Sequence, residues 1–264
     1  MFKKNIIRLF CNKNYSMPRK KREENTEEVK ELKNDNTFKY KVEVKCKNEK
    51  QKDFLNILKN KNKTICFGIG SPGSGKSFLS IGYALKALKD KANEFNQLIF
   101  IVPTVEAGAM NIGYLRGTLE EKTQVYQEAD KYTMSKILRQ SGNENPDSTI
   151  NQLISNKAID YQLVNFARGK TFDNCILLIN EAENYSKQDM LLLLTRMGNN
   201  CKVICTGDEE QMDRKDIKKT NSTSGMIYAI NKLKELEEVD VVKFEKEDIV
   251  RNPLIGKIID LWNK

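Results

Sequence analysis

Histidine is absent from all 264 residues of the chain. Because histidine is the side chain that changes charge near neutral pH and a common metal ligand, its absence excludes His-based acid–base catalysis and His metal sites. The six cysteines are scattered and include no C-x-x-C pair, so no zinc site is predicted. Several of them stand in apolar, strand-like runs and no secretory signal is recognised, which favours reduced thiols and a cytoplasmic location.

Long apolar runs are missing as well. No stretch approaches the roughly 20 residues that a membrane-spanning helix needs, and we therefore expect no membrane partner. Hydrophobic residues nevertheless make up 39% of the chain, which is enough for a substantial core. The length suits one large domain or one domain with a tail.

The excess of positive charge is confined to one part of the chain. Residues 1–63 hold 19 Lys and Arg against nine Asp and Glu, whereas residues 64–264 hold 26 against 27. Two interpretations are open: the N-terminal part binds RNA, DNA or another polyanion, or it is a solvated and partly disordered arm. We predict a flexible basic and acidic arm over residues 1–36 and one domain over residues 37–264.

One short stretch matches the phosphate-loop motif G-x-x-x-x-G-K-[ST] at every fixed position. Its residues are Gly70, Ser71, Pro72, Gly73, Ser74, Gly75, Lys76 and Ser77. Residues 64–69 have the apolar character of a buried strand, and residues 78–85 have helical spacing, which is the context that the motif requires. Backbone N–H groups would cradle a polyphosphate, Lys76 would reach the β and γ phosphates, and Ser77 would bind Mg²⁺. The alternative is a glycine-rich turn that happens to contain a lysine.

Further apolar runs predict the rest of a sheet. They lie at residues 98–102, 161–164, 175–179, 201–206 and 240–244. Helical patterns separate several of these runs, so we predict an α/β fold with a mainly parallel sheet and helices on both of its faces. Alternation over residues 37–44 predicts an edge strand, and residues 48–58 predict an amphipathic helix. In such sheets, ligands bind at the carboxyl ends of the strands.

Polar residues follow two of the apolar runs. Asn180 and Glu181 come after residue 179, where ATPases commonly place one acid for the Mg²⁺ water shell and a second that polarises water. Asn180 offers a carbonyl oxygen without charge, so we expect weaker metal binding there, with Glu181 as the base. Asp208 and Gln211 would sense the γ-phosphate or position water, although a polar loop of this kind is usually structural.

Gln51 lies on the helix predicted before the phosphate-loop strand. A glutamine amide can pair with both N6 and N7 of adenine, so Gln51 is a candidate for base recognition. The alternative is an ordinary exposed glutamine, and spacing alone favours that alternative.

With these residues placed, the chain resembles the PhoH-like ATPases, which are relatives of superfamily 1 helicases. The resemblance runs from about Asn48 to Trp262 and rests on seven blocks in the family's order: residues 70–77, 105–108, 168–171, 181–184, 194–198, 206–211 and 250–254. It implies a RecA-like P-loop core with ATP and Mg²⁺ as ligands. It also implies an adenine contact for Gln51 and γ-phosphate contacts for Asp208 and Gln211. Arg251 would be an arginine finger.

The chain departs from the family at the acidic strand end. The family's pattern there is similar to Asp-Glu-Ala-Gln, whereas residues 180–183 are Asn-Glu-Ala-Glu. We expect this change to affect the rate of ATP hydrolysis more than the binding of ATP. Superfamily 1 helicases close a nucleotide between two RecA-like domains, and this chain is expected to supply one. We therefore predict a ring-like homo-oligomer, a hexamer, in which Arg251 acts on the ATP of a neighbouring subunit.

We favour a cytoplasmic, Mg²⁺-dependent ATPase whose hydrolysis is coupled to single-stranded nucleic acid, RNA before DNA. The residues expected near the nucleic-acid path are Thr104, Glu106, Arg168 and Lys170. The alternative is a nucleotide-switched binding protein that turns ATP over poorly because of Asn180. A small-molecule kinase is a third hypothesis, which the order of the blocks disfavours.

Overall fold

The computed structural model describes residues 39–90, 95–103, 119–208 and 224–262. All of these belong to the second of the two compact units into which the chain divides, Thr37–Lys264. Four predictions lie outside the described residues: the arm over residues 1–36 and the roles of Thr104, Glu106 and Gln211.

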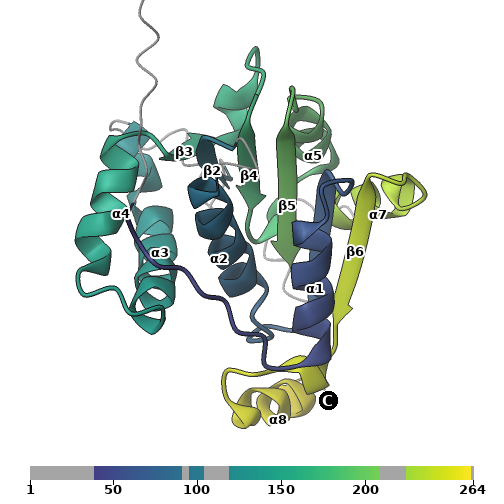
Figure 1. Cartoon of the computed structure of the whole chain (residues 1–264). Helices are drawn as coiled ribbons and strands as arrows, with labels where there is room; N and C mark the ends of the chain where they lie inside the picture. Colours follow the sequence, from purple (N-terminus) through teal and green to yellow (C-terminus); the bar gives the residue numbers. More distant parts are fainter. Residues whose placement is uncertain (1–38, 91–94, 104–118, 209–223, 263–264) are drawn as a thin grey trace, which may run out of the picture. The chain divides into compact units, whose positions relative to one another are not determined.

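Within the described residues, six parallel strands form one sheet (Figure 1). The strands are β1 (Ile65–Gly70), β2 (Gln97–Val102), β3 (Ile159–Leu163), β4 (Cys175–Ile179), β5 (Cys201–Gly207) and β6 (Val239–Phe244). Their order across the sheet is β3-β2-β4-β5-β1-β6, and each neighbouring pair is parallel. This order, with a phosphate loop after β1, confirms the predicted α/β fold of the RecA-like P-loop type.

Helices cover both faces of the sheet. The helices of the described residues are α1 (Glu49–Lys59), α2 (Lys76–Lys89), α3 (Leu119–Gln140), α4 (Pro146–Ser155), α5 (Lys187–Leu194), α7 (Gly225–Leu233) and α8 (Pro253–Trp262), with short 3-10 helices η3 (Val164–Ala167), η4 (Ala182–Asn184) and η6 (Lys246–Asp248). Phe100 and Leu178 pack into a core shared with α1, α2, α3 and α4. Ile99 and Leu177 face the opposite core, shared with α5 and α7. The alternation of side chains along buried strands thus fills two cores.

The predicted edge strand over residues 37–44 is wrong. The described residues of this segment are extended but pair with no strand. The backbone N–H of Lys41 donates to Asn143 Oδ1 at 2.9 Å, and that of Glu43 donates to Ser141 Oγ at 2.8 Å. Both acceptors lie in the turn between α3 and α4, so side chains take the place of a neighbouring strand.

Helix α7 is not predicted by the sequence analysis. Ser224 caps its first turn by accepting a hydrogen bond of 3.2 Å from the N–H of Met226, which is fully buried. In the part of the chain that the structure describes, no helix has the length and apolar content needed to cross a membrane.

Candidate nucleotide-binding site

The phosphate loop leaves β1 and enters α2 through a backbone in which three glycines, Gly70, Gly73 and Gly75, have a positive φ. Gly70 has a φ of 119°, and a Cβ there would lie 1.9 Å from the carbonyl oxygen of Phe244 on β6. Gly75, with a φ of 93°, directly precedes α2. These conformations turn the chain tightly, so that the positive end of α2 faces the inside of the loop. The predicted strand, loop and helix are confirmed.

Lys76 is the first residue of α2 and is only 8% exposed. Its Nζ donates to the carbonyl oxygens of Gly70 and Ser71, the latter at 2.8 Å, and to Ser74 Oγ at 3.3 Å. Burial lowers the pKa of Lys76 to about 8, and the Asp208 carboxylate opposes that shift. The ammonium group is thus held over the loop, where a phosphate would offset the cost of its burial.

A cavity of about 570 Å³ opens beside the loop and is lined by Gly73, Gly75, Lys76 and Ser77. The other charged side chains in its wall are Glu43, Lys45, Lys47, Lys136 and Arg251. Five cations therefore face this cavity together with one acid. That balance suits a ligand with several negative charges, such as a nucleoside triphosphate.

Gln51 braces the phosphate loop from α1. It is 3% exposed, its Nε2 donates to the Ser74 carbonyl at 2.8 Å, and its Oε1 accepts from the N–H of Lys47 at 2.7 Å. The alternative of an ordinary exposed glutamine is therefore wrong. Because both ends of the amide are already bonded to backbone, an adenine contact would have to compete with these two bonds, and that contact stays a prediction.

Arg251 lies beside the phosphate loop of its own chain. The N–H of Val250 donates to the Gly73 carbonyl at 3.0 Å, and a Cβ on Gly73 would lie 3.2 Å from the Cβ of Arg251. Arg251 lines the same cavity as Lys76. The pairing of β6 with β1 brings the chain after β6 back to the loop, within reach of a ligand in this cavity. The action of Arg251 on the ATP of a neighbouring subunit stays a prediction.

The end of β4 holds Asn180 in a fixed orientation. Its Oδ1 accepts from Thr206 Oγ1 at 2.8 Å, and its Nδ2 donates to Asp130 Oδ1 on α3 at 3.2 Å. Burial raises the pKa of Asp130, and the hydrogen bond from Asn180 opposes that rise. Glu181 follows with an exposed side chain and a φ of 50°, a backbone conformation that non-glycine residues rarely adopt. Such strain is often found at functional sites.

Glu183 and Asp208 lie together at the carboxyl ends of β4 and β5. The N–H of Asp208 donates to Glu183 Oε2 at 3.0 Å, and the two residues are 4% and 6% exposed. Burial raises the pKa of Glu183 to about 7. In the sequence, Glu183 stands out only as a departure from the family's acidic strand end, and no pattern marks Asp130. Its partner Asn180 lies 50 residues away in the chain, so no local pattern marks the pair.

Arg168 and Lys170 are exposed and follow η3, beyond the carboxyl end of β3. Lys170 Nζ donates to Gln162 Oε1 on that strand. Three strands separate β3 from β1, so these two side chains share the sheet edge with the phosphate loop without joining its cavity.

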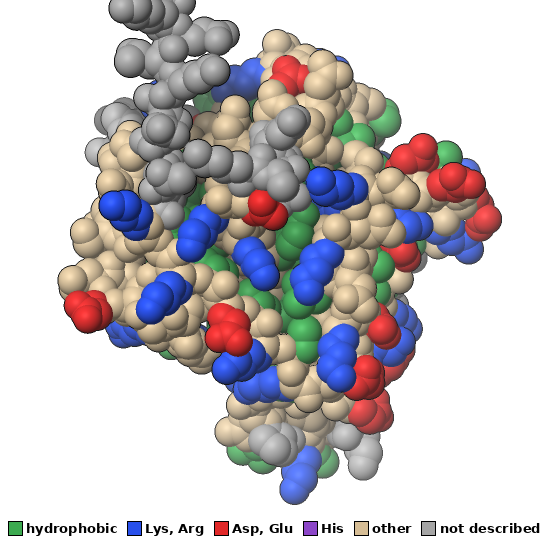
Figure 2. All heavy atoms as spheres, viewed as in Figure 1, with side chains coloured by type: hydrophobic (Ala, Val, Ile, Leu, Met, Phe, Trp, Pro, Cys, Tyr) green, Lys and Arg blue, Asp and Glu red, His purple; other side chains and the backbone are tan. Residues whose placement is uncertain are grey.

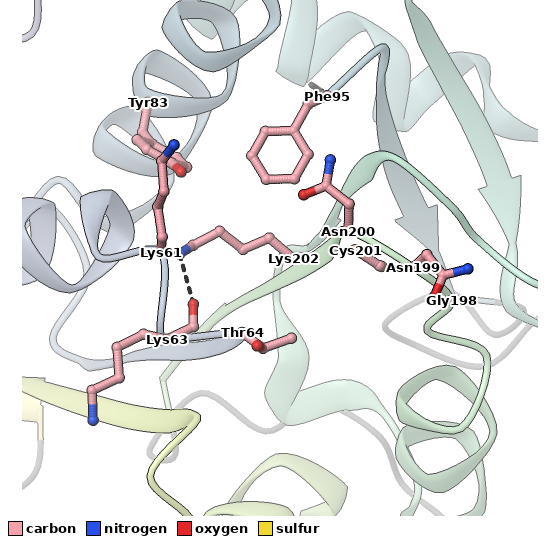
Figure 3. A pocket seen from close by; sticks show the side chains of 10 residues that line it. All are labelled: Lys61, Lys63, Thr64, Tyr83, Phe95, Gly198, Asn199, Asn200, Cys201 and Lys202. Atoms are coloured by element: carbon pink, nitrogen blue, oxygen red, sulfur yellow. Dashed lines mark hydrogen bonds between the residues drawn. The ribbon is translucent and has the colours of Figure 1, made fainter. Parts of the chain in front are cut away.

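A second cavity of similar volume, about 570 Å³, lies at the opposite, amino-terminal end of the strands (Figure 3). Lys61, Lys63 and Lys202 line it together with Phe95. Lys202 is 4% exposed, and its Nζ donates to the carbonyls of Asn60 and Lys63 at 2.9 and 2.6 Å. Lys202 thereby anchors the turn before β1. None of the predicted site residues lines this cavity.

Residues 43–263 match the family model described as PhoH-like protein, which covers the phosphate loop, the Asn180 strand end and Arg251. The chain belongs to the PhoH-like protein family. It is 30% identical over 222 residues to a PhoH-like protein of Bacillus subtilis, covering 84% of this chain and 64% of that protein. It is 28% identical over 222 residues to Protein PhoH of Escherichia coli, covering 83% of this chain and 58% of that protein.

This PhoH-like chain therefore spans 58% to 64% of the length of these two curated relatives. Among solved structures it is similar to the Pif1 helicase from Candida albicans, at 16% identity and a TM-score of 0.41, over 83% of this chain and 44% of that one. That likeness is too distant to inform function. Family membership and the phosphate loop together place the chain among nucleotide-binding P-loop proteins.

Proposed function

We propose that this protein is a Mg²⁺-dependent ATPase whose hydrolysis is coupled to single-stranded nucleic acid, with RNA preferred over DNA. The observation that carries the proposal is the cavity lined by Lys76 and Ser77 of the phosphate loop, in which Lys76 is one of five cations. Its chemistry matches a triphosphate, and Arg251 stands close enough to the loop to share in binding it.

The side chains in the cavity suit Mg²⁺ as a companion of ATP. Within the described residues, no group of three or more His, Cys, Asp or Glu forms a metal cage. Mg²⁺ needs no such cage, because it keeps several waters and binds substrate phosphates with one or two protein oxygens. Ser77 and Asn180 would hold it, with Glu181 nearby, and bound Mg²⁺ would neutralise charge on the β and γ phosphates.

The chain's own residues have separate roles in this mechanism. Lys76 and Arg251 stabilise the negative charge that develops on the γ-phosphate. Glu181 polarises the attacking water at the end of β4. Asp208, directly after β5, contacts the γ-phosphate, and Gln211 is proposed to contact it as well. Gln51 holds the phosphate loop in shape while adenine binds beside it.

Single-stranded nucleic acid would bind near Arg168 and Lys170 at the carboxyl edge of the sheet, and Thr104 and Glu106 are proposed to contact it as well. The excess of Lys and Arg in residues 1–63 supports a polyanionic partner. Figure 2 shows Lys and Arg side chains over the face that carries α1 and α2. Binding that depends on such charges should weaken steeply as salt is raised.

The protein acts as a ring-like homo-oligomer, a hexamer, in this proposal. Helix α8 packs beside the phosphate loop and exposes three large apolar side chains at helical spacing, Leu254, Ile258 and Leu261, which are 56%, 50% and 71% exposed. An apolar helix face beside the ATP cavity fits a contact with a second copy of the chain.

An ATPase titration with single-stranded RNA and DNA tests the proposal. We expect RNA to stimulate turnover, and Lys76→Ala to abolish it by removing the phosphate-binding ammonium group. The matched control is Lys86→Ala, an exposed lysine on the same helix, which should behave as the wild type. Absence of turnover with and without nucleic acid, despite ATP binding, would instead support the second candidate.

That second candidate is a nucleotide-switched binding protein, and Asn180 is the observation that favours it. An amide at this position contributes no charge to a metal site. The second candidate predicts that bound ATP changes the affinity for nucleic acid, while the rate of ATP hydrolysis is no higher than that of the Lys76→Ala variant. Measuring RNA affinity with ATP and with a non-hydrolysable analogue separates the two candidates.

A further inference from the structure

The side-chain amide of Asn180 forms one hydrogen bond with an acid and one with a hydroxyl group. Thr206 Oγ1 donates to its Oδ1 at 2.8 Å, while its Nδ2 points to Asp130 Oδ1 at 3.2 Å. An amide nitrogen can only donate, and a carboxylate can only accept, so the orientation of both side chains follows from this pair.

An acid at position 180 would not fit the same arrangement. It would place a second carboxylate oxygen about 3.2 Å from Asp130 Oδ1, where two negative charges repel strongly because little water separates them. Positions 130 and 180 therefore suit one acid and one amide. The acid is on α3 in this chain, and the amide is on β4.

Asp130 has no cationic partner within the described residues. Its hydrogen-bond partner there is Asn180, and no Lys or Arg forms an ion pair with it. A carboxyl group withdrawn from water without a cation is costly, unless a cation that is bound only in the working state offsets that cost.

Helix α3 also reaches the nucleotide cavity. Tyr132, Thr133 and Lys136, within two turns of Asp130, line that cavity together with Lys76 and Ser77. One helix thus carries both the carboxyl group at the end of β4 and part of the wall of the phosphate cavity. This juxtaposition connects Asp130 to the site where ATP is proposed to bind.

We propose that Asp130 supplies the negative charge that the end of β4 lacks, so that Asp130 and Asn180 together form the acidic part of the Mg²⁺–ATP site. The inference rests on the proposed function, since it concerns the same site. Asp130 acts as a positioning residue, because its hydrogen bond holds the Asn180 carbonyl in place and its charge attracts the ion. Where the family has an acid at position 180, this chain carries the negative charge on Asp130, which is joined to Asn180 by a hydrogen bond.

The test is the ratio of the Kd for ATP in EDTA to the Kd in Mg²⁺, measured by calorimetry on the full chain. Asp130→Asn should lower this ratio about tenfold or more, as loss of a partner of a metal ligand commonly does, and should leave the Kd in EDTA unchanged. The double variant Asn180→Asp/Asp130→Asn exchanges acid and amide and should regain the wild-type ratio. Glu128→Gln, an exposed acid on the same helix, is the matched control and should keep it.

Three results would overturn the inference: a wild-type ratio in Asp130→Asn, no recovery in the double variant, or ATP binding by the wild type that ignores Mg²⁺. If Asp130→Asn does not fold, Asn180→Asp and the double variant decide instead, because removing Asp130 should cost nothing once position 180 is an acid. Failure of the proposed function has a different signature, namely Mg²⁺-dependent ATP binding without any turnover.

Discussion

The side chain of Gln51 ties helix α1 to the phosphate loop, because its Nε2 donates a 2.8 Å hydrogen bond to the carbonyl oxygen of Ser74. Ser74 is fully buried, and a Cβ on Gly75 would lie 2.8 Å from the same nitrogen. The loop is therefore shaped from outside by a residue that precedes it by 23 positions. Base recognition and loop support are two roles for one amide, and they can be separated by experiment.

Gln51→Ala should weaken ATP and GTP binding equally. The substitution leaves the Ser74 carbonyl and the Lys47 N–H without their partner, which should lower the free energy of unfolding by about 1–3 kcal/mol. A looser loop binds any triphosphate less well. Calorimetric titration with both nucleotides, together with urea unfolding, checks the prediction.

The control for Gln51 is Gln188→Ala on α5, where the glutamine is exposed. This variant should bind both nucleotides as the wild type does. A loss of ATP affinity in Gln51→Ala with GTP affinity intact would contradict the supporting role and favour direct contact with adenine.

The sequence was sufficient for those parts of the fold whose signal is local. Strand β4 is buried on both faces and is a continuous apolar run, so its position follows from composition alone. For residues 37–44, by contrast, the sequence pattern did not predict the pairing. Alternation of apolar and polar residues indicates which side chains are buried. It does not indicate that the backbone N–H of Lys41 bonds to the side chain of Asn143, which is about a hundred residues away.

The same distinction applies to the candidate site. The phosphate loop is a contiguous motif, so strand, loop and helix could be predicted together. The position of Arg251 beside the phosphate loop depends on the pairing of β6 with β1, which cannot be deduced from the spacing of motifs. The contact between Asp130 and Asn180 is of the same kind, since it depends on where α3 crosses the end of β4.

Glu183 should make the protein less stable as the pH rises. Its pKa in the folded protein is about 7, above the ordinary value of 4.5, so between these values the folded state holds a proton that the unfolded state has lost. Stability from this group is complete below pH 4.5 and is lost as the pH rises through 7. Glu183→Gln should remove that loss and stabilise the protein at pH 8, by at most about 3 kcal/mol.

Urea unfolding of wild type and Glu183→Gln at pH 5 and pH 8, without nucleotide, measures this difference. Asp189→Asn would disturb a helix cap, so the exposed Glu235→Gln is the suitable control, and it should show the wild-type dependence on pH. An equal stability change in Glu183→Gln at both pH values would contradict the prediction.

Ile258→Glu should dissociate the oligomer. Ile258 is half exposed on α8, and a carboxylate in an apolar contact between subunits would be buried without a partner. Light scattering in ATP and Mg²⁺ should show a monomer for this variant and a larger mass for the wild type. Leu236→Glu, which is equally exposed at the opposite end of β6, should keep the wild-type mass. A monomeric wild type would contradict the ring.

Arg251 should act on the ATP of its own subunit, because it lies beside its own Gly73. Arg251→Ala is expected to lower kcat about a thousandfold, as loss of an arginine finger does. Mixing Arg251→Ala with Lys76→Ala then decides between the two geometries. If Arg251 acted across an interface, a Lys76→Ala subunit would supply the arginine to an Arg251→Ala neighbour, and activity would return in the mixture. With both residues working on one ATP, the mixture should stay as inactive as its components, whereas each variant mixed with wild type should retain turnover in proportion to the wild-type subunits.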